Sequence, residues 1–64
     1  MVKINGQETD AQGMTLLAYV EAKGFRPDRI AVELNGCIVQ RSTYGDTILH
    51  DGDSLEIVHF VGGG

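Results

Sequence analysis

The sequence predicts an α+β fold in which one main helix packs on one face of a mixed β-sheet of about four to five strands. Short stretches of alternating apolar and polar residues indicate strands on both sides of a single stretch with helical spacing. Two Asn-Gly dipeptides, at residues 5–6 and 35–36, are typical of tight hairpin turns. With 64 residues the chain forms one domain, and its single helix leaves the other face of the sheet open.

The first strands are expected to form a hairpin. Val2 and Ile4 alternate with polar neighbours, which gives a short strand with one apolar face. After the Asn5-Gly6 turn, the return strand over residues 7–10 is polar throughout. We therefore expect it at a solvent-exposed edge of the sheet.

The helix is expected over residues 16–23. Thr15 can cap its N-terminus, and Gly24 stands where a left-handed C-cap glycine is expected. Pro27 disfavours a helical conformation for the residue before it, so the helix cannot continue. The apolar face of this helix is expected to comprise Leu16, Leu17 and Val20.

A second hairpin follows. Residues 30–34 alternate cleanly, the Asn35-Gly36 turn comes next, and residues 37–40 form the return strand. Residues 42–49 lack a firm period and are expected to hold a short turn of helix, before a turn at Asp51-Gly52-Asp53.

Residues 54–61 form the last and most apolar strand. Its Leu55 and Ile57 are expected to face the helix, while Val58 and Phe60 face the open side. The opposite register, with Val58 and Phe60 in the core, is the alternative. Exposed apolar residues in a cluster often mark a partner surface. The partner interface is therefore expected at Val58, Phe60 and Val61.

The sequence ends in three glycines directly after this strand. Glycine has no side chain to pack, so we expect residues 1–61 to form the domain and residues 62–64 a flexible tail. Four extended residues reach on the order of 13 Å, at about 3.3–3.6 Å each. Gly62 and Gly63 could thread into a partner and deliver the carboxylate of Gly64. A frayed end without function is the alternative.

Composition excludes several classes of function. The net charge is −4 and the five basic residues are dispersed, which argues against a nucleic-acid surface. No apolar run approaches the roughly 18–20 residues of a membrane span, and no secretory signal is visible. The single cysteine cannot form an intramolecular disulfide, so a cytoplasmic setting is expected.

No side chains form a recognisable catalytic or metal-binding set. Cys37 is expected to be a small packing residue, although a persulfide or thioester role is the alternative. His50 and His59 are expected to be isolated surface residues. Turn chemistry explains Asp51 and Asp53 better than metal binding does. The chain itself is thus expected to hold no catalytic residue, metal or cofactor.

The ending DGDSLEIVHFVGGG, residues 51–64, resembles the terminus of the thiamin-biosynthesis sulfur carrier family, ThiS. The segment VELNG at residues 32–36, followed by Ile38-Val39 and Arg41-Ser42, is also similar, and the spacing agrees along the whole chain. Two positions depart from the pattern: Tyr44 stands where relatives often have tryptophan, and Cys37 does not belong to it.

The resemblance implies a ubiquitin-like β-grasp fold and a defined chemistry. In this family a ThiF-type adenylating enzyme uses ATP to adenylate the terminal carboxylate, here that of Gly64. Sulfur derived from a cysteine desulfurase then displaces AMP and leaves a thiocarboxylate. A ThiG-type thiazole synthase uses this sulfur for the thiazole ring of thiamin. The protein would be a co-substrate and not an enzyme.

Three other functions remain open. The small subunit of molybdopterin synthase has the same kind of tail, although it is usually longer. A ubiquitin-like modifier would pass the activated carboxylate to lysine amines instead of sulfur. A plain interaction domain would have an inert terminus.

Overall fold

The computed structural model describes residues 1–60. The interface residue Val61 and the tail residues Gly62, Gly63 and Gly64 lie outside the described residues. Along the chain the elements are β1 (Val2–Ile4), β2 (Gln7–Thr9), α1 (Leu16–Ala22), the 3₁₀ turn η1 (Pro27–Arg29), β3 (Ile30–Leu34), β4 (Cys37–Ile38), the 3₁₀ helix η2 (Arg41–Asp46) and β5 (Ser54–His59).

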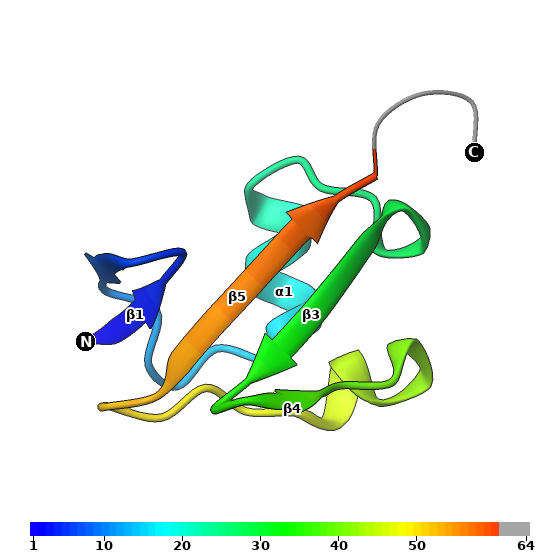
Figure 1. The fold of residues 1–64 in the computed structure, drawn as a ribbon. Helices are drawn as coiled ribbons and strands as arrows, with labels where there is room; N and C mark the ends of the chain where they lie inside the picture. The colour runs from blue at the N-terminus through cyan, green and yellow to red at the C-terminus, as the bar shows by residue number, and fades with distance from the viewer. Residues whose placement is uncertain (61–64) are drawn as a thin grey trace.

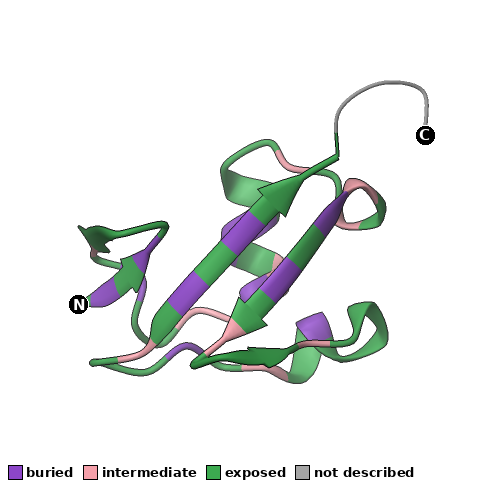
Figure 2. Ribbon diagram, viewed as in Figure 1, coloured by how far each residue is buried: buried purple, intermediate pink, exposed green. Residues whose placement is uncertain are grey.

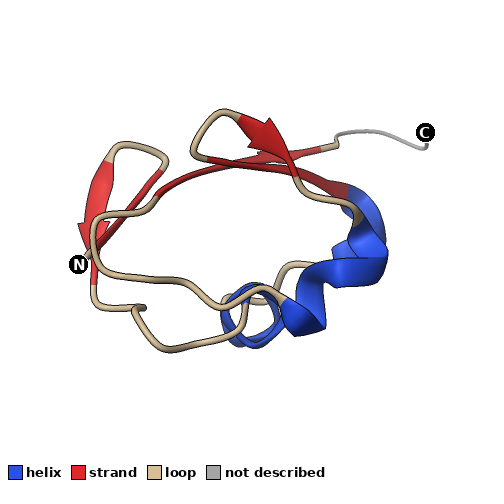
Figure 3. Ribbon diagram, turned by 90° about the horizontal axis from the view of Figure 1, so that it is seen from below, coloured by secondary structure: helices blue, strands red, loops and turns tan. Residues whose placement is uncertain are grey.

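The strands form one five-stranded sheet in the order β2-β1-β5-β3-β4. β1 and β5 are parallel, and every other neighbouring pair is antiparallel. The helix and both 3₁₀ segments lie on one side of this sheet (Figures 1 and 3). The predicted α+β class, mixed sheet and β-grasp arrangement are confirmed, with β5 in the centre of the sheet.

Both Asn-Gly dipeptides form the predicted hairpin turns. Asn5 and Gly6 have φ angles of 50° and 83°, and Asn35 and Gly36 have 52° and 86°. Two consecutive positive φ angles are the requirement of a type I′ turn, which matches the twist of the strands that it joins. The first turn brings the polar strand β2 to the edge of the sheet, as predicted.

Helix α1 begins and ends as its capping residues require. The Thr15 Oγ1 accepts a hydrogen bond of 3.1 Å from the amide of Ala18. At the other end Gly24 has φ +83°, its amide donates to Glu21, and the amide of Phe25 donates to the carbonyl of Val20 at 2.9 Å. This pair of bonds is a Schellman motif. The helix ends at Ala22, one residue before the predicted end.

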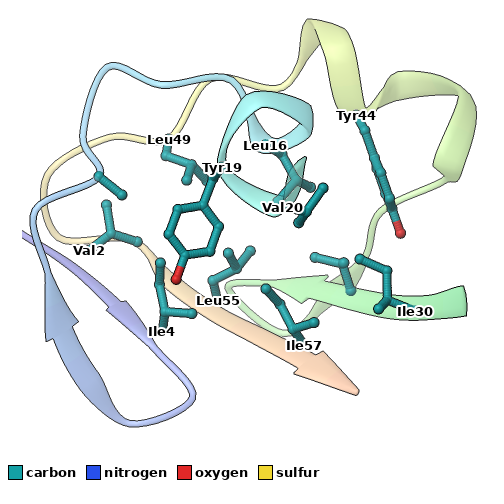
Figure 4. Packing of buried hydrophobic residues seen from close by; sticks show 12 residues of the cluster. Val2, Ile4, Leu16, Tyr19, Val20, Ile30, Tyr44, Leu49, Leu55 and Ile57 are labelled. Carbon is teal, nitrogen blue, oxygen red and sulfur yellow. The ribbon is translucent and has the colours of Figure 1, made fainter. Parts of the chain in front are cut away.

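The core lies between the sheet and α1 (Figure 4). The expected core residues of the three apolar strands β1, β3 and β5 are buried, except that Leu34 is only partly buried. On the helix the predicted packing of Leu16, Leu17 and Val20 against the core is confirmed, with Leu17 only partly buried. The prediction omitted Tyr19, which is buried about one turn after Leu16. Of the residues that the structure describes, twelve are buried: Val2, Ile4, Ala11, Leu16, Tyr19, Val20, Ile30, Val32, Tyr44, Leu49, Leu55 and Ile57.

The second hairpin departs from prediction at its return strand. β4 comprises only Cys37–Ile38 and not residues 37–40. The expectation that Cys37 packs in the interior is wrong, because this short edge strand leaves the thiol exposed. The segment after it forms η2, as expected for a short turn of helix, and buries Tyr44. Burial raises the pKa of the Tyr44 phenol.

Candidate functional site

Strand β5 and the residue after it place Val58 and Phe60, two of the residues predicted for the interface, on the open face of the sheet. Leu55 and Ile57 are buried under the helix, whereas Val58 is 59% exposed and Phe60 is 49% exposed. Buried and exposed residues alternate along β5 in Figure 2. The predicted register of β5 is therefore confirmed, and the alternative that placed Val58 and Phe60 in the core is wrong.

Two further residues belong to the apolar part of this face. Ala31 stands opposite Val58 in the β3–β5 ladder and is exposed. Ile38 stands opposite Glu33 and is the most exposed large apolar residue described, at 77%. Residues directly opposite on neighbouring strands share a face. We call Ala31, Ile38, Val58 and Phe60 the open-face patch.

An acidic pair borders the open-face patch. Glu33 of β3 and Glu56 of β5 stand directly opposite each other and are both exposed. Like charges at this spacing destabilise a sheet slightly. A positively charged partner surface would remove that repulsion. The alternation along residues 54–61 already placed Glu56 on the face of Val58 and Phe60. Sequence reasoning missed its pairing with Glu33 and missed Ile38, because only the register between strands shows which side chains stand together.

The asparagine side chains of the two Asn-Gly turns also form hydrogen bonds to the backbone of β5. Asn5 Oδ1 accepts from the amide of Ile57 at 2.7 Å, and its Nδ2 donates to the Ile57 carbonyl at 3.2 Å. Asn35 Oδ1 accepts from the amide of Ser54 at 2.9 Å. The end of the strand is fixed by the amide of Phe60, which donates to the carbonyl of Arg29 at 2.8 Å. Phe60, the last residue that the structure describes, is thus hydrogen-bonded to the sheet.

The Asp53 carboxylate accepts hydrogen bonds just before the start of β5, and these bonds make the stability of the fold depend on pH. Its carboxylate accepts from Asn35 Nδ2 at 3.0 Å and from the amide of His50 at 2.8 Å. These bonds favour the charged form, so they lower the pKa of Asp53. A carboxyl group whose pKa is lower in the folded state contributes stability above its unfolded pKa, and that contribution is lost as pH falls through the folded pKa.

We therefore expect Asp53→Asn to weaken the acid dependence of stability. The wild type should lose more unfolding free energy than the variant between neutral pH and roughly pH 3, where carboxyl groups titrate. Urea unfolding at a series of pH values measures this. Asp46→Asn is the control, since Asp46 is exposed and its carboxylate accepts no hydrogen bond from residues 1–60. Parallel curves for wild type and Asp53→Asn would contradict the assignment.

The remaining polar candidates lie apart. His50 and His59 are both exposed, as predicted; His50 Nδ1 lies 3.8 Å from Asp53 Oδ2, and the His59 ring lies 5.9 Å from that of Phe25. The Asp51-Gly52-Asp53 segment is the predicted turn, with Gly52 at φ +90°. Residues 1–60 contain no group of three His, Cys, Asp or Glu side chains that could hold a metal ion. No helix in this range is long and apolar enough to cross a membrane.

Comparison with known proteins gives a family match over nearly the whole chain. The model of the ThiS family matches residues 2–64. The crystal structure of a thiamine biosynthesis protein (ThiS) from Geobacter metallireducens superposes with a TM-score of 0.77 at 31% identity, covering 98% of this chain and 97% of that one.

Two similar curated proteins are much longer. The chain is 42% identical over 64 residues to a thiazole synthase of Magnetococcus marinus, and 44% identical over 62 residues to a thiazole synthase of Paramagnetospirillum magneticum. These matches cover 98% and 95% of the chain, but 20% and 19% of the relatives. The chain thus spans about a fifth of the length of these relatives.

Proposed function

The chain belongs to the ThiS family, and from this membership we propose that it is a sulfur carrier of thiamin biosynthesis. The carrier group is the carboxylate of Gly64, which is converted to a thiocarboxylate. The observation that carries the proposal is the position of Val58 and Phe60, exposed at the end of a strand held by hydrogen bonds, with one residue in the sequence between Phe60 and the three glycines. A docking surface and a carboxylate-bearing arm are then consecutive in the chain.

The chemistry explains why a partner is needed. A carboxylate at neutral pH is a poor acyl donor, because it carries no good leaving group. Adenylation by ATP attaches AMP and releases pyrophosphate. The outer sulfur of a persulfide can then attack the carbonyl, so that AMP leaves, and a thiol such as cysteine cleaves the resulting sulfur–sulfur bond to release the thiocarboxylate. Charge that develops on phosphate and carbonyl must be stabilised by cations or oriented donors. The described part of this acidic chain holds no such cluster, so we assign that role to a ThiF-type adenylating enzyme.

We propose two further partners. A cysteine desulfurase supplies the sulfur, and a thiazole synthase consumes it. The thiazole synthase proposal is supported by the curated relatives of that name, in which a segment similar to this chain makes up about a fifth of the polypeptide. In this account the chain is a protein co-substrate.

Intact mass measurement tests the function. The chain is incubated with the adenylating enzyme, ATP, a cysteine desulfurase and cysteine. Exchange of one oxygen for sulfur at Gly64 is the expected result. A ladder of larger conjugates would instead identify a ubiquitin-like modifier, and an unchanged mass would identify an inert terminus. Either of these outcomes refutes the sulfur carrier.

We expect Phe60→Ala to weaken docking to the adenylating enzyme about tenfold, because aromatic residues carry much of the binding energy of interfaces. Folding stability should change little, since the side chain is already 49% exposed. A binding titration measures the affinity. Ile48→Ala is the matched control, because Ile48 is equally exposed but lies outside the strands of the sheet. Equal affinities of the two variants would remove Phe60 from the interface.

A further inference from the structure

Among residues 1–60, no strand pairs with the β1-side edge of β5 near its end. In the β3–β5 ladder the amide of Phe60 donates to Arg29, and the amide of Asn35 donates to the carbonyl of Ser54. In an antiparallel pair such hydrogen-bonded positions alternate with positions whose backbone groups point the other way. The N–H and C=O groups of Leu55, Ile57 and His59 therefore point away from β3, toward the β1 side.

On the β1 side, only some of the backbone N–H and C=O groups along this edge of β5 have a hydrogen-bond partner. The Leu55 carbonyl accepts from the amide of Asn5 at 2.9 Å, and the side chain of Asn5 satisfies both backbone groups of Ile57. β1 ends at Ile4, so β5 continues beyond it (Figure 1). Within residues 1–60, the backbone N–H and C=O of His59 meet no partner.

A groove lies along the same edge. It has a volume of about 340 Å³, and its walls combine Ile4, Tyr19, Phe25 and Ile57 with the polar residues Asn5, Gln7 and Thr9. Lys23 is its one charged lining residue; the ammonium lies 5.9 Å from the centre of the Tyr19 ring. Among the described residues Lys23 forms no ion pair. The groove thus offers apolar surface, uncharged polar groups and one positive charge.

We propose that this edge of β5 and the adjoining groove bind an extended segment of the thiazole synthase by strand addition. In this mode the backbone of the added strand bonds to the exposed edge, and alternate side chains enter adjoining pockets. Here the backbone bonds form at His59, and an acidic side chain of the segment enters the groove toward Lys23. The inference rests on the proposed function, which names the thiazole synthase as a partner.

Two observations favour this occupant. The groove carries a single positive charge on a chain whose net charge is −4, so a negative side chain is the complementary ligand. In the curated relatives, a similar segment is part of a polypeptide named thiazole synthase. Within such a polypeptide the edge and the rest of the enzyme are present at high effective concentration.

Two variants of His59 distinguish the contribution of its backbone N–H to binding from that of its side chain. His59→Pro and His59→Ala both remove the imidazole, but only proline removes the N–H that faces the open edge. Proline is tolerated where the N–H points away from the neighbouring strand, so pairing with β3 can persist. We expect His59→Pro to bind the thiazole synthase about tenfold more weakly than His59→Ala in a calorimetric titration. Equal affinities would overturn the proposal.

Hydrogen exchange of the unaltered protein gives a second test that does not depend on folding of a variant. The His59 amide should exchange quickly in the isolated chain and at least about tenfold more slowly in the complex with the thiazole synthase. Unchanged exchange, or slowing caused by the chain alone at high concentration or by the adenylating enzyme alone, would overturn strand addition by the synthase.

The same samples distinguish this inference from the proposed function. His59→Pro should form the thiocarboxylate as the wild type does, because strand addition is assigned to the thiazole synthase. A wild type that forms no thiocarboxylate refutes the sulfur carrier. A wild type that forms it normally, with no change in His59 exchange on binding the synthase, refutes the strand addition alone.

Discussion

Gly63→Val is expected to abolish adenylation of Gly64 while leaving the fold intact. The proposed arm must enter the active site of the adenylating enzyme, and glycine allows a narrow passage and backbone angles that other residues rarely adopt. A β-branched side chain next to the reacting carboxylate would misplace it, and a misplacement of about 1 Å can cost a hundredfold in rate. We expect kcat/KM for adenylation to fall at least about a hundredfold.

Pyrophosphate release measures this loss, and thermal unfolding verifies the fold. Gly45→Ala is the matched control for adding a side chain at a glycine. Gly45 does not have a positive φ, and an added Cβ would meet only the Leu17 side chain at 3.7 Å. That variant should be adenylated as the wild type is. Normal adenylation of Gly63→Val would refute the threading of the arm.

Leu55→Ala is expected to unfold a large fraction of the molecules. Leu55 is 1% exposed in the central strand and stands opposite Leu34 and beside Ile4. Truncating a buried leucine costs about 2–5 kcal/mol. A domain of 64 residues has a total stability of about 3–10 kcal/mol, at about 0.05–0.15 kcal/mol per residue. One substitution can therefore remove most of the stability.

Urea unfolding measures the loss for Leu55→Ala. Val58→Ala is the control on the same strand, because Val58 is 59% exposed on the open face. It should lose no more than about 1 kcal/mol, since little apolar surface leaves a buried environment. If the two variants lost similar stability, the assignment of β5 faces, and with it the docking surface, would be wrong.

The fold was predictable where short segments of the chain determine their own conformation. Both Asn-Gly turns and the caps at Thr15 and Gly24 depend on residues within a few positions of one another. The register of β5 followed from its alternation, because a shift by one residue would expose Leu55 and bury Glu56. The alternation alone therefore predicted that Val58 and Phe60 lie on the open face, without information on tertiary contacts.

The missed features depend on tertiary contacts. Ala11 and Leu49 lie in irregular segments, and their burial comes from packing on α1 and the sheet. Tyr19 is buried on the side of the helix that faces Ile4 and Ile57, which come from strands distant in sequence (Figure 4). The pairing of Glu33 with Glu56 depends on the register between strands distant in sequence. Likewise, the bonds of Asn5 to Ile57 join residues 52 positions apart, so no local pattern signals them.

Sulfur transfer from a shortened chain tests the central claim most directly. The wild type and a version lacking Gly63 and Gly64 are each incubated with the adenylating enzyme, ATP and ³⁵S-labelled cysteine with a desulfurase, and then with the thiazole synthase and its other substrates. Label in the thiazole product is measured. The account predicts label from the wild type and none above background from the shortened chain. Equal labelling from the shortened chain would contradict it.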